Sequence, residues 1–161
     1  MEQNLDHHFS AESIFSEEKC QERITALTRL LHSPGEENLW NAIILFQGYP
    51  FRTVSGLPFS YTIKIGKNGQ LTKELLINRR ENSKSLTWSS ICLAYKKALH
   101  TDEVVARPKK LGDIRGISYI YPILWQFGII KVPESSKKAM GSEMPGNTSF
   151  SSSYDNNKII G

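Results

Sequence analysis

The chain has 161 residues, of which 39% are hydrophobic and 22% are charged, and its 20 Lys and Arg outnumber its 16 Asp and Glu. This composition is typical of a globular protein and argues against a fibrous or wholly disordered one. Its longest apolar run, residues 119–130, is shorter than the roughly 20 residues that cross a bilayer. The acidic N-terminus has no apolar signal core, and two cysteines cannot build a disulfide framework, so we expect a cytoplasmic protein with no membrane partner.

The charge is distributed unevenly along the chain. Residues 1–48 carry 8 acidic and 3 basic side chains, whereas residues 49–132 carry 14 basic and 5 acidic ones. Residues 133–161 carry 3 of each and are neutral. A basic middle segment attracts a polyanion or an acidic protein face, although a basic surface also serves solubility.

The first part of the chain predicts a helical hairpin. Residues 1–16 show no sustained period and are expected to form a disordered tail. Apolar residues at helical spacing predict a helix over 17–31, which Ser33-Pro34-Gly35 ends, and a second helix over 36–46. The hairpin therefore occupies residues 17–48.

From residue 49 onward, the residue pattern changes to short runs of β-branched and aromatic residues. Runs at 51–54, 59–65 and 71–77 are separated by Gly-containing turns, and Asn68-Gly69 is a strong hairpin signal. We expect a three-stranded antiparallel meander with a basic, hydroxyl-bearing outer face.

The remaining elements are mostly helical. The apolar pattern predicts a helix over 86–99, capped by Ser85 or Thr87, a short helix over 108–113 and a third helix over 119–127. Gly116-Ile117-Ser118 is interpreted as a turn followed by an N-cap, Gly128 as a C-cap and residues 129–132 as a strand.

The elements together predict an α+β fold with one compact domain. It contains the helical hairpin, 17–48, and a basic segment, 49–132, made of the β-meander and a three-helix module. Residues 133–161 are rich in Ser, Gly, Asn and Lys and are expected to be a second disordered tail.

One group of residues has the ingredients of a phosphate site. Arg79, Arg80 and Lys84 precede Ser85 and Thr87 at a predicted helix start, where hydroxyls, backbone N–H groups and cations can bind an oxyanion. Alternatively, these residues form only an N-cap that follows an exposed, charged loop and bind no anion. Further cations on the predicted sheet extend this candidate patch: Lys64, Lys67 and Lys73. We expect the double change Arg79→Ala and Arg80→Ala to weaken binding and leave the thermal midpoint nearly unchanged.

The sequence contains no recognisable catalytic, cofactor or metal motif. His7 and His8 have no ligand partner at usable spacing, and no Cys-x-x-Cys, zincin helix, nucleophile elbow or phosphate-binding loop is present. We therefore expect a protein that is not an enzyme and needs no cofactor.

Residues 86–132 resemble a winged helix-turn-helix. The resemblance lies in the Pro-x-x-Leu start of the short helix, the small-Ile-Ser turn and the aromatic-Gly-Ile-Ile exit. It implies a C-terminal winged-helix-like module in which the start of the third helix faces a nucleic-acid groove and nearby cations contact phosphates. The groove-facing residues would be Ser118, Tyr119 and Tyr121, and the phosphate contacts Lys109, Lys110 and Arg115. Alternatively, the aromatic residues of 119–127 fill a core or pair with a second copy.

Three longer stretches are similar to a group of small uncharacterised basic proteins of bacterial accessory and mobile genomes. These stretches are LWNAIILFQGYPFRTVSGLPFSYTIKI, ELLINRRENSKSLTWSS and RPKKLGDIRGISYIYPILWQFGIIKVP. The resemblance covers most of residues 38–133 and implies phage- or plasmid-type roles.

The leading hypothesis is a non-enzymatic, basic, nucleic-acid-binding or regulatory protein of a mobile element. The alternative is a protein inhibitor of a nucleic-acid-targeting defence nuclease, of the anti-CRISPR or anti-restriction type. The partner is then nucleic acid or a nucleoprotein enzyme, and the oligomeric state stays open.

Overall fold

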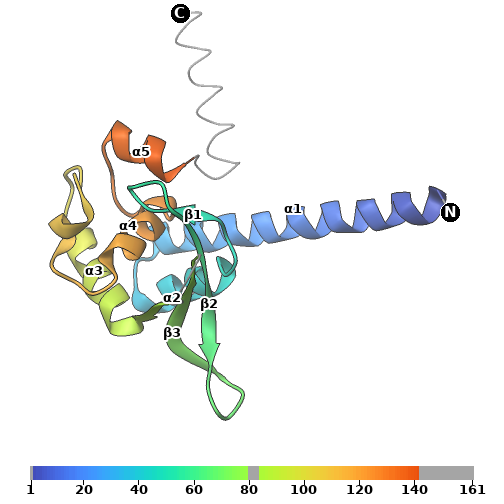
Figure 1. The fold of residues 1–161 in the computed structure, drawn as a ribbon, viewed down its shortest axis with the longest axis horizontal. Helices are drawn as coiled ribbons and strands as arrows, with labels where there is room; N and C mark the ends of the chain where they lie inside the picture. The colour runs from blue at the N-terminus through green and yellow to red at the C-terminus, as the bar shows by residue number, and fades with distance from the viewer. Residues whose placement is uncertain (1, 80–83, 142–161) are drawn as a thin grey trace, which may run out of the picture. The chain divides into compact units, whose positions relative to one another are not determined.

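A computed structural model of the chain describes residues 2–79 and 84–141, with residues 2–15 described by their helical backbone alone. The chain divides between residues 46 and 47 into two compact units. That the hairpin and the basic segment form one compact domain over 17–132 stays a prediction. Each unit is therefore described by itself. The fold is α+β, with five α-helices and a four-stranded antiparallel sheet among the described residues (Figure 1).

The first unit consists of α1 (Glu2–His32) and α2 (Glu36–Leu45), joined by the predicted Ser-Pro-Gly turn. Both helices contribute buried apolar side chains, and Arg23 donates from Nε to the Leu45 carbonyl at 3.0 Å near the end of α2. The expectation of a disordered tail over 1–16 is wrong for residues 2–16, which are helical. That segment has no sustained apolar period, but it also has no Gly or Pro to interrupt a helix.

The second unit is built on a sheet with the strand order β1-β2-β3-β4, comprising β1 (Phe51–Arg52), β2 (Pro58–Ile65), β3 (Leu71–Asn78) and β4 (Lys84–Thr87). The expected meander accounts for three of these strands. The fourth, β4, occupies residues that the sequence analysis assigned to a loop and a helix start. Its pairing with β3 places Leu86 opposite Leu75, and both side chains are buried.

One face of the sheet supplies much of the core. The side chains of Tyr61, Ile63, Leu75 and Ile77 are at most 4% exposed. The ring of Phe51 stacks on Phe59 and Tyr61, with centroids 5.5 Å and 5.9 Å away. The clean alternation of β2 in the sequence therefore marks its buried face correctly.

The helices that follow the sheet occur in the order that the sequence predicted. They are α3 (Trp88–Leu99), the 3-10 helix η1 (Pro108–Leu111) and α4 (Ile117–Gln126). Helices α3 and α4 pack on the sheet, and η1 packs on these two helices. Thr87 caps α3 by accepting from the Ser90 N–H, which confirms one of the two predicted caps. Gly128, at φ 80°, ends α4 while the Ile129 N–H reaches back to the Leu124 carbonyl.

The end of the second unit differs from the expectation in two ways. Residues 129–132 do not form a strand. The Val105 N–H donates to the Lys131 carbonyl, but residues 129–132 are not part of a β-ladder. The wing strand implied by the winged-helix resemblance is therefore not formed by these residues. The expected disordered tail is also wrong for α5 (Glu134–Met140), where Pro133 is the N-cap and Met140 is buried. Residues 142–161 of that tail lie outside the described part.

Candidate polyanion-binding surface

The start of α4 lies directly on the sheet because of one glycine. Gly116 is the N-cap of α4 at φ 79°, and a Cβ at this position would overlap Cδ2 of Leu86 on β4. Only a residue with no side chain allows so close an approach of backbone and strand. Arg115 precedes Gly116 directly and Ser118 follows it by two residues; both are exposed, and the contact holds their stretch of backbone near β4.

A second contact ties the end of β3 to the same helix. Arg79 donates from Nη1 to the hydroxyl of Tyr119, and its guanidinium carbon lies 5.8 Å from the centroid of the Tyr119 ring. That ring is itself held edge-on against Phe59, with centroids 5.0 Å apart. Arg79 remains exposed although Tyr119 is only 6% exposed.

These two contacts bring together residues that the sequence analysis had placed in separate groups. Lys84 pairs with Ile77, two residues before Arg79, and precedes Leu86 by two residues. We call Arg79, Lys84, Arg115 and Ser118 the convergence surface. None of its three cations has a carboxylate within 4.0 Å among the described residues. Arg80, which the sequence analysis grouped with Arg79, lies outside the described residues.

The predicted lysines of η1 form a separate group, and α3, which packs on η1, carries two lysines that sequence reasoning missed. Lys109 and Lys110 are exposed on η1, which packs against α3 and α4. Lys97 of α3 extends toward this segment, with its Nζ 3.5 Å from the position of a Gly112 Cβ. Lys96 and Lys97 are not among the candidate residues that the sequence predicts. Their position in the last turn of α3, shortly before Pro-Lys-Lys, was the available signal.

The basic patch expected on the sheet is not assembled, because alternate residues of a strand point to opposite faces. Lys64 on the outer face pairs with Glu74 at 3.8 Å. Lys73 belongs to the other face, where its Nζ lies 5.3 Å from the centroid of the Trp88 ring. Lys67 is exposed in the turn between β2 and β3. These three lysines therefore do not form one surface.

The hydroxyls at the start of α3 act as a cap. Thr87 Oγ1 accepts from the Ser90 N–H at 3.3 Å and lies 3.0 Å from Ser90 Oγ and 3.1 Å from Ser89 Oγ. Ser85 and Thr87 are both on the outer face of the sheet, opposite Leu76 and Glu74. The hydrogen-bonding capacity of Thr87 is thus used within the helix start, which favours the capping interpretation over an anion site.

Two of the predicted groove-facing residues are in the core instead. Tyr121 is fully buried and donates its hydroxyl to the Val105 carbonyl, and Tyr119 packs on Phe59. Burial raises the pKa of Tyr121, against a smaller lowering by the Ser136 hydroxyl. The expectation that these rings face a ligand is therefore wrong, because large aromatic surfaces are costly to expose. Of the three residues, only Ser118 is exposed.

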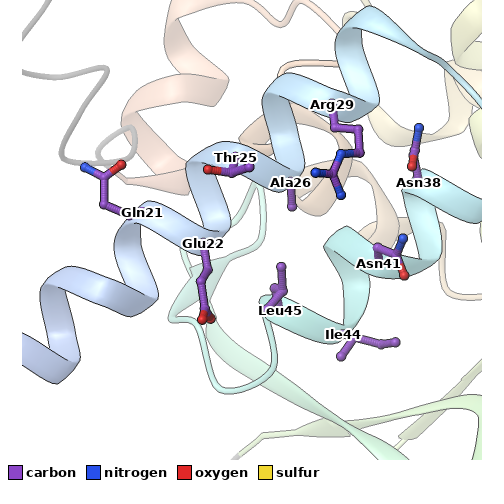
Figure 2. Close-up of a pocket in the computed structure, with 9 residues that line it drawn as sticks. All are labelled: Gln21, Glu22, Thr25, Ala26, Arg29, Asn38, Asn41, Ile44 and Leu45. Atoms are coloured by element: carbon purple, nitrogen blue, oxygen red, sulfur yellow. The ribbon is translucent and has the colours of Figure 1, made fainter.

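The first unit contains a groove that no sequence motif predicts. Figure 2 shows it between α1 and α2. Its volume is about 550 Å³. Ala26, Ile44 and Leu45 contribute apolar surface, and the other lining side chains are polar: Gln21, Glu22, Thr25, Arg29, Asn38 and Asn41. The lining carries one acidic and one basic side chain and offers both hydrogen-bond donors and acceptors.

No protein-family model matches the chain, and no curated protein or solved structure is significantly similar to it. Within the described residues, no helix combines the length and the apolar character needed to span a bilayer. His, Cys, Asp and Glu side chains do not gather in groups of three or more that could hold a metal ion anywhere in the same residues.

Proposed function

We propose that this chain is a non-enzymatic nucleic-acid-binding protein whose convergence surface contacts the phosphate backbone. The observation that carries the proposal is that the Gly116–Leu86 approach and the Arg79–Tyr119 contact join the chain segments that carry Arg79, Lys84 and Arg115, none of which has a carboxylate partner in the described residues. Cations that are fixed on packed elements and left unpaired are suited to phosphates, because they do not have to break an ion pair to bind.

The η1 lysines extend this proposal. Lys109 and Lys110 are exposed and have no ion-pair partner among the residues that the structure describes, and η1 packs on α4. The winged-helix resemblance assigns the same two residues to phosphates. The resemblance proposed from the sequence to proteins of mobile genomes is the reason for proposing a regulatory role on phage or plasmid nucleic acid.

Salt dependence tests the proposal. Binding of a fluorescein-labelled 20-base-pair duplex is measured by fluorescence anisotropy between 50 and 200 mM salt. Three phosphate contacts at the convergence surface alone contribute about −2.7 to the slope of log K against log salt, which is roughly a 40-fold loss of affinity over this range, and two contacts from the η1 lysines would add about −1.8. Arg115→Ala is expected to reduce the slope by about 0.9.

Lys138 provides a matched control for that variant. It is an exposed cation on α5 and lies outside both basic groups. Lys138→Ala removes the same charge and should leave the slope unchanged. Equal effects of the two variants would mean that only net charge matters and would refute a contact at the convergence surface.

One observation favours the alternative function, inhibition of a nucleic-acid-targeting enzyme by direct protein contact. Leu93 is 50% exposed on α3, and Lys96 and Lys97 follow it by three and four residues on the same helix face. An apolar side chain among cations matches an acidic protein face better than a phosphate backbone. A stable 1:1 complex that survives nuclease treatment, with Leu93→Ser weakening it, would support this alternative over direct nucleic-acid binding.

A further inference from the structure

Arg79 differs from the other two cations of the convergence surface because an aromatic residue holds it. One of the five N–H groups of its guanidinium is donated to the Tyr119 hydroxyl, and the Tyr119 ring lies beneath the guanidinium. Lys84 and Arg115 have no comparable contact among the described residues. The Arg79 side chain is thus exposed, and Tyr119 fixes the orientation of its guanidinium.

We propose that Tyr119 is a positioning residue, which fixes the Arg79 guanidinium so that its remaining N–H groups are presented to a phosphate. This inference rests on the proposed nucleic-acid-binding function and deepens it. Tyr119 does not touch the ligand itself, because its ring is buried against Phe59. Its hydroxyl acts through Arg79 alone.

The physical basis is the entropy of a long side chain. A free arginine must give up its rotamers when it binds a phosphate, and this loss costs affinity. Tyr119 already restricts the rotamers of Arg79 in the free protein, because its hydrogen bond and its ring contact both hold the guanidinium. The planar guanidinium can then donate two N–H groups to two phosphate oxygens in a fixed, bidentate geometry.

Tyr119→Phe is the minimal test, because it removes the hydroxyl that accepts from Arg79 and keeps the ring. We expect the Kd for the labelled duplex to rise roughly 2- to 12-fold, the range for immobilising one rotamer-rich side chain on binding. The salt slope should stay unchanged, because the positive charge of Arg79 is still present. Arg79→Ala should instead reduce the slope by about 0.9.

Tyr121→Phe is the matched control. It deletes a hydroxyl from the same helix, but that hydroxyl is bonded to the Val105 carbonyl and makes no contact with Arg79. We expect this variant to be less stable to urea and to bind with the wild-type Kd. If Tyr121→Phe weakens binding as much as Tyr119→Phe does, a general structural effect explains both and the positioning role is overturned.

A double variant makes the test specific. In the Arg79→Ala background, Tyr119→Phe should have no further effect on the Kd, because the residue that it positions is gone. Additive losses would overturn the proposal, and so would a wild-type Kd for Tyr119→Phe alone. Arg79→Lys keeps the positive charge but removes the planar guanidinium. It should raise the Kd by a factor similar to that of Tyr119→Phe and leave the salt slope unchanged.

The failure of the proposed function has a different signature. If the wild-type protein shows no salt-dependent binding of the duplex, the nucleic-acid-binding proposal and the positioning role are both overturned. If the wild type binds but Tyr119→Phe binds with the same Kd, only the positioning role of Tyr119 is overturned. Relaxation of the Arg79 Nε resonance in the free protein gives an independent readout: Tyr119→Phe should increase its mobility.

Discussion

The contact between Gly116 and Leu86 can be tested by adding a single methyl group. Gly116→Ala places a Cβ that overlaps Cδ2 of Leu86 and lies 3.5 Å from its Cγ, in a residue at φ 79°. Two separate costs arise. A non-glycine residue in the left-handed region costs about 1–2 kcal/mol, and forcing Leu86 from its packed position costs about 1–3 kcal/mol.

The clash cost is not avoided by a simple rotation of Leu86. Its side chain is only 2% exposed, so a new rotamer would have to displace other core atoms. We therefore expect Gly116→Ala to lower the free energy of unfolding by about 2–5 kcal/mol in urea denaturation followed by circular dichroism.

Gly69 separates the two costs. It has the same φ of 79°, but a Cβ there would meet nothing within 4 Å. Gly69→Ala should therefore lose only the backbone part, about 1–2 kcal/mol. If Gly116→Ala is no more destabilised than Gly69→Ala, the close approach to Leu86 does not exist in solution, and the convergence surface loses its structural basis.

Three further predictions follow from single contacts. Thr87→Ala removes the cap of α3 and should lower the unfolding free energy by about 1 kcal/mol in urea. The free energy of unfolding should fall as pH rises above about 10, because burial raises the pKa of Tyr121 above its ordinary 10.0 and the unfolded chain loses that proton first; Tyr121→Phe, compared at pH 9 and 11, should lack this component. The double change Lys109→Ala and Lys110→Ala should reduce the salt slope of duplex binding by about 1.8, and an unchanged slope would exclude η1 from the binding surface.

The local elements of the second unit were largely predictable from the sequence. The buried stripe of α3 and its Thr87 cap follow from helical spacing and from the preference of Thr for N-caps. The alternation of β2 likewise assigned its buried face correctly. In both cases the information lies within one short segment.

Features that depend on contacts between distant segments were not predictable. Strand β4 has only four residues, and what makes Lys84–Thr87 a strand is its pairing with β3. Ser118 was the expected cap of α4, but Gly116 is the N-cap, because only glycine fits against Leu86. Local preference gave way to tertiary contact in each case.

The candidate site shows the same limit. Sequence reasoning selected Arg79, Arg115 and Tyr119, but it assigned the first to a loop and the other two to a separate helical module. The hydrogen bond between Arg79 and Tyr119 joins residues 40 positions apart. No local pattern reports such a contact, so the cations were found but not their arrangement.

Arg79 also corrects an expectation about stability. Because its guanidinium is bonded to Tyr119, Arg79→Ala should not leave the thermal midpoint unchanged. Loss of one hydrogen bond and one exposed cation–π contact is expected to lower the unfolding free energy by about 1–2 kcal/mol. For a unit of this size, each kcal/mol corresponds to a fall of roughly 4–8 °C in the thermal midpoint, which scanning fluorimetry resolves.

The same variant must therefore be interpreted through two measurements. A weaker Kd for Arg79→Ala can come from a lost phosphate contact or from a loosened α4, since the side chain serves both. Only the lost contact changes the number of released counterions, so only it reduces the salt slope by about 0.9. A lower thermal midpoint with an unchanged slope would make Arg79 purely structural and leave Lys84 and Arg115 to carry binding at the convergence surface. An unchanged midpoint would instead show that the bond to Tyr119 does not form.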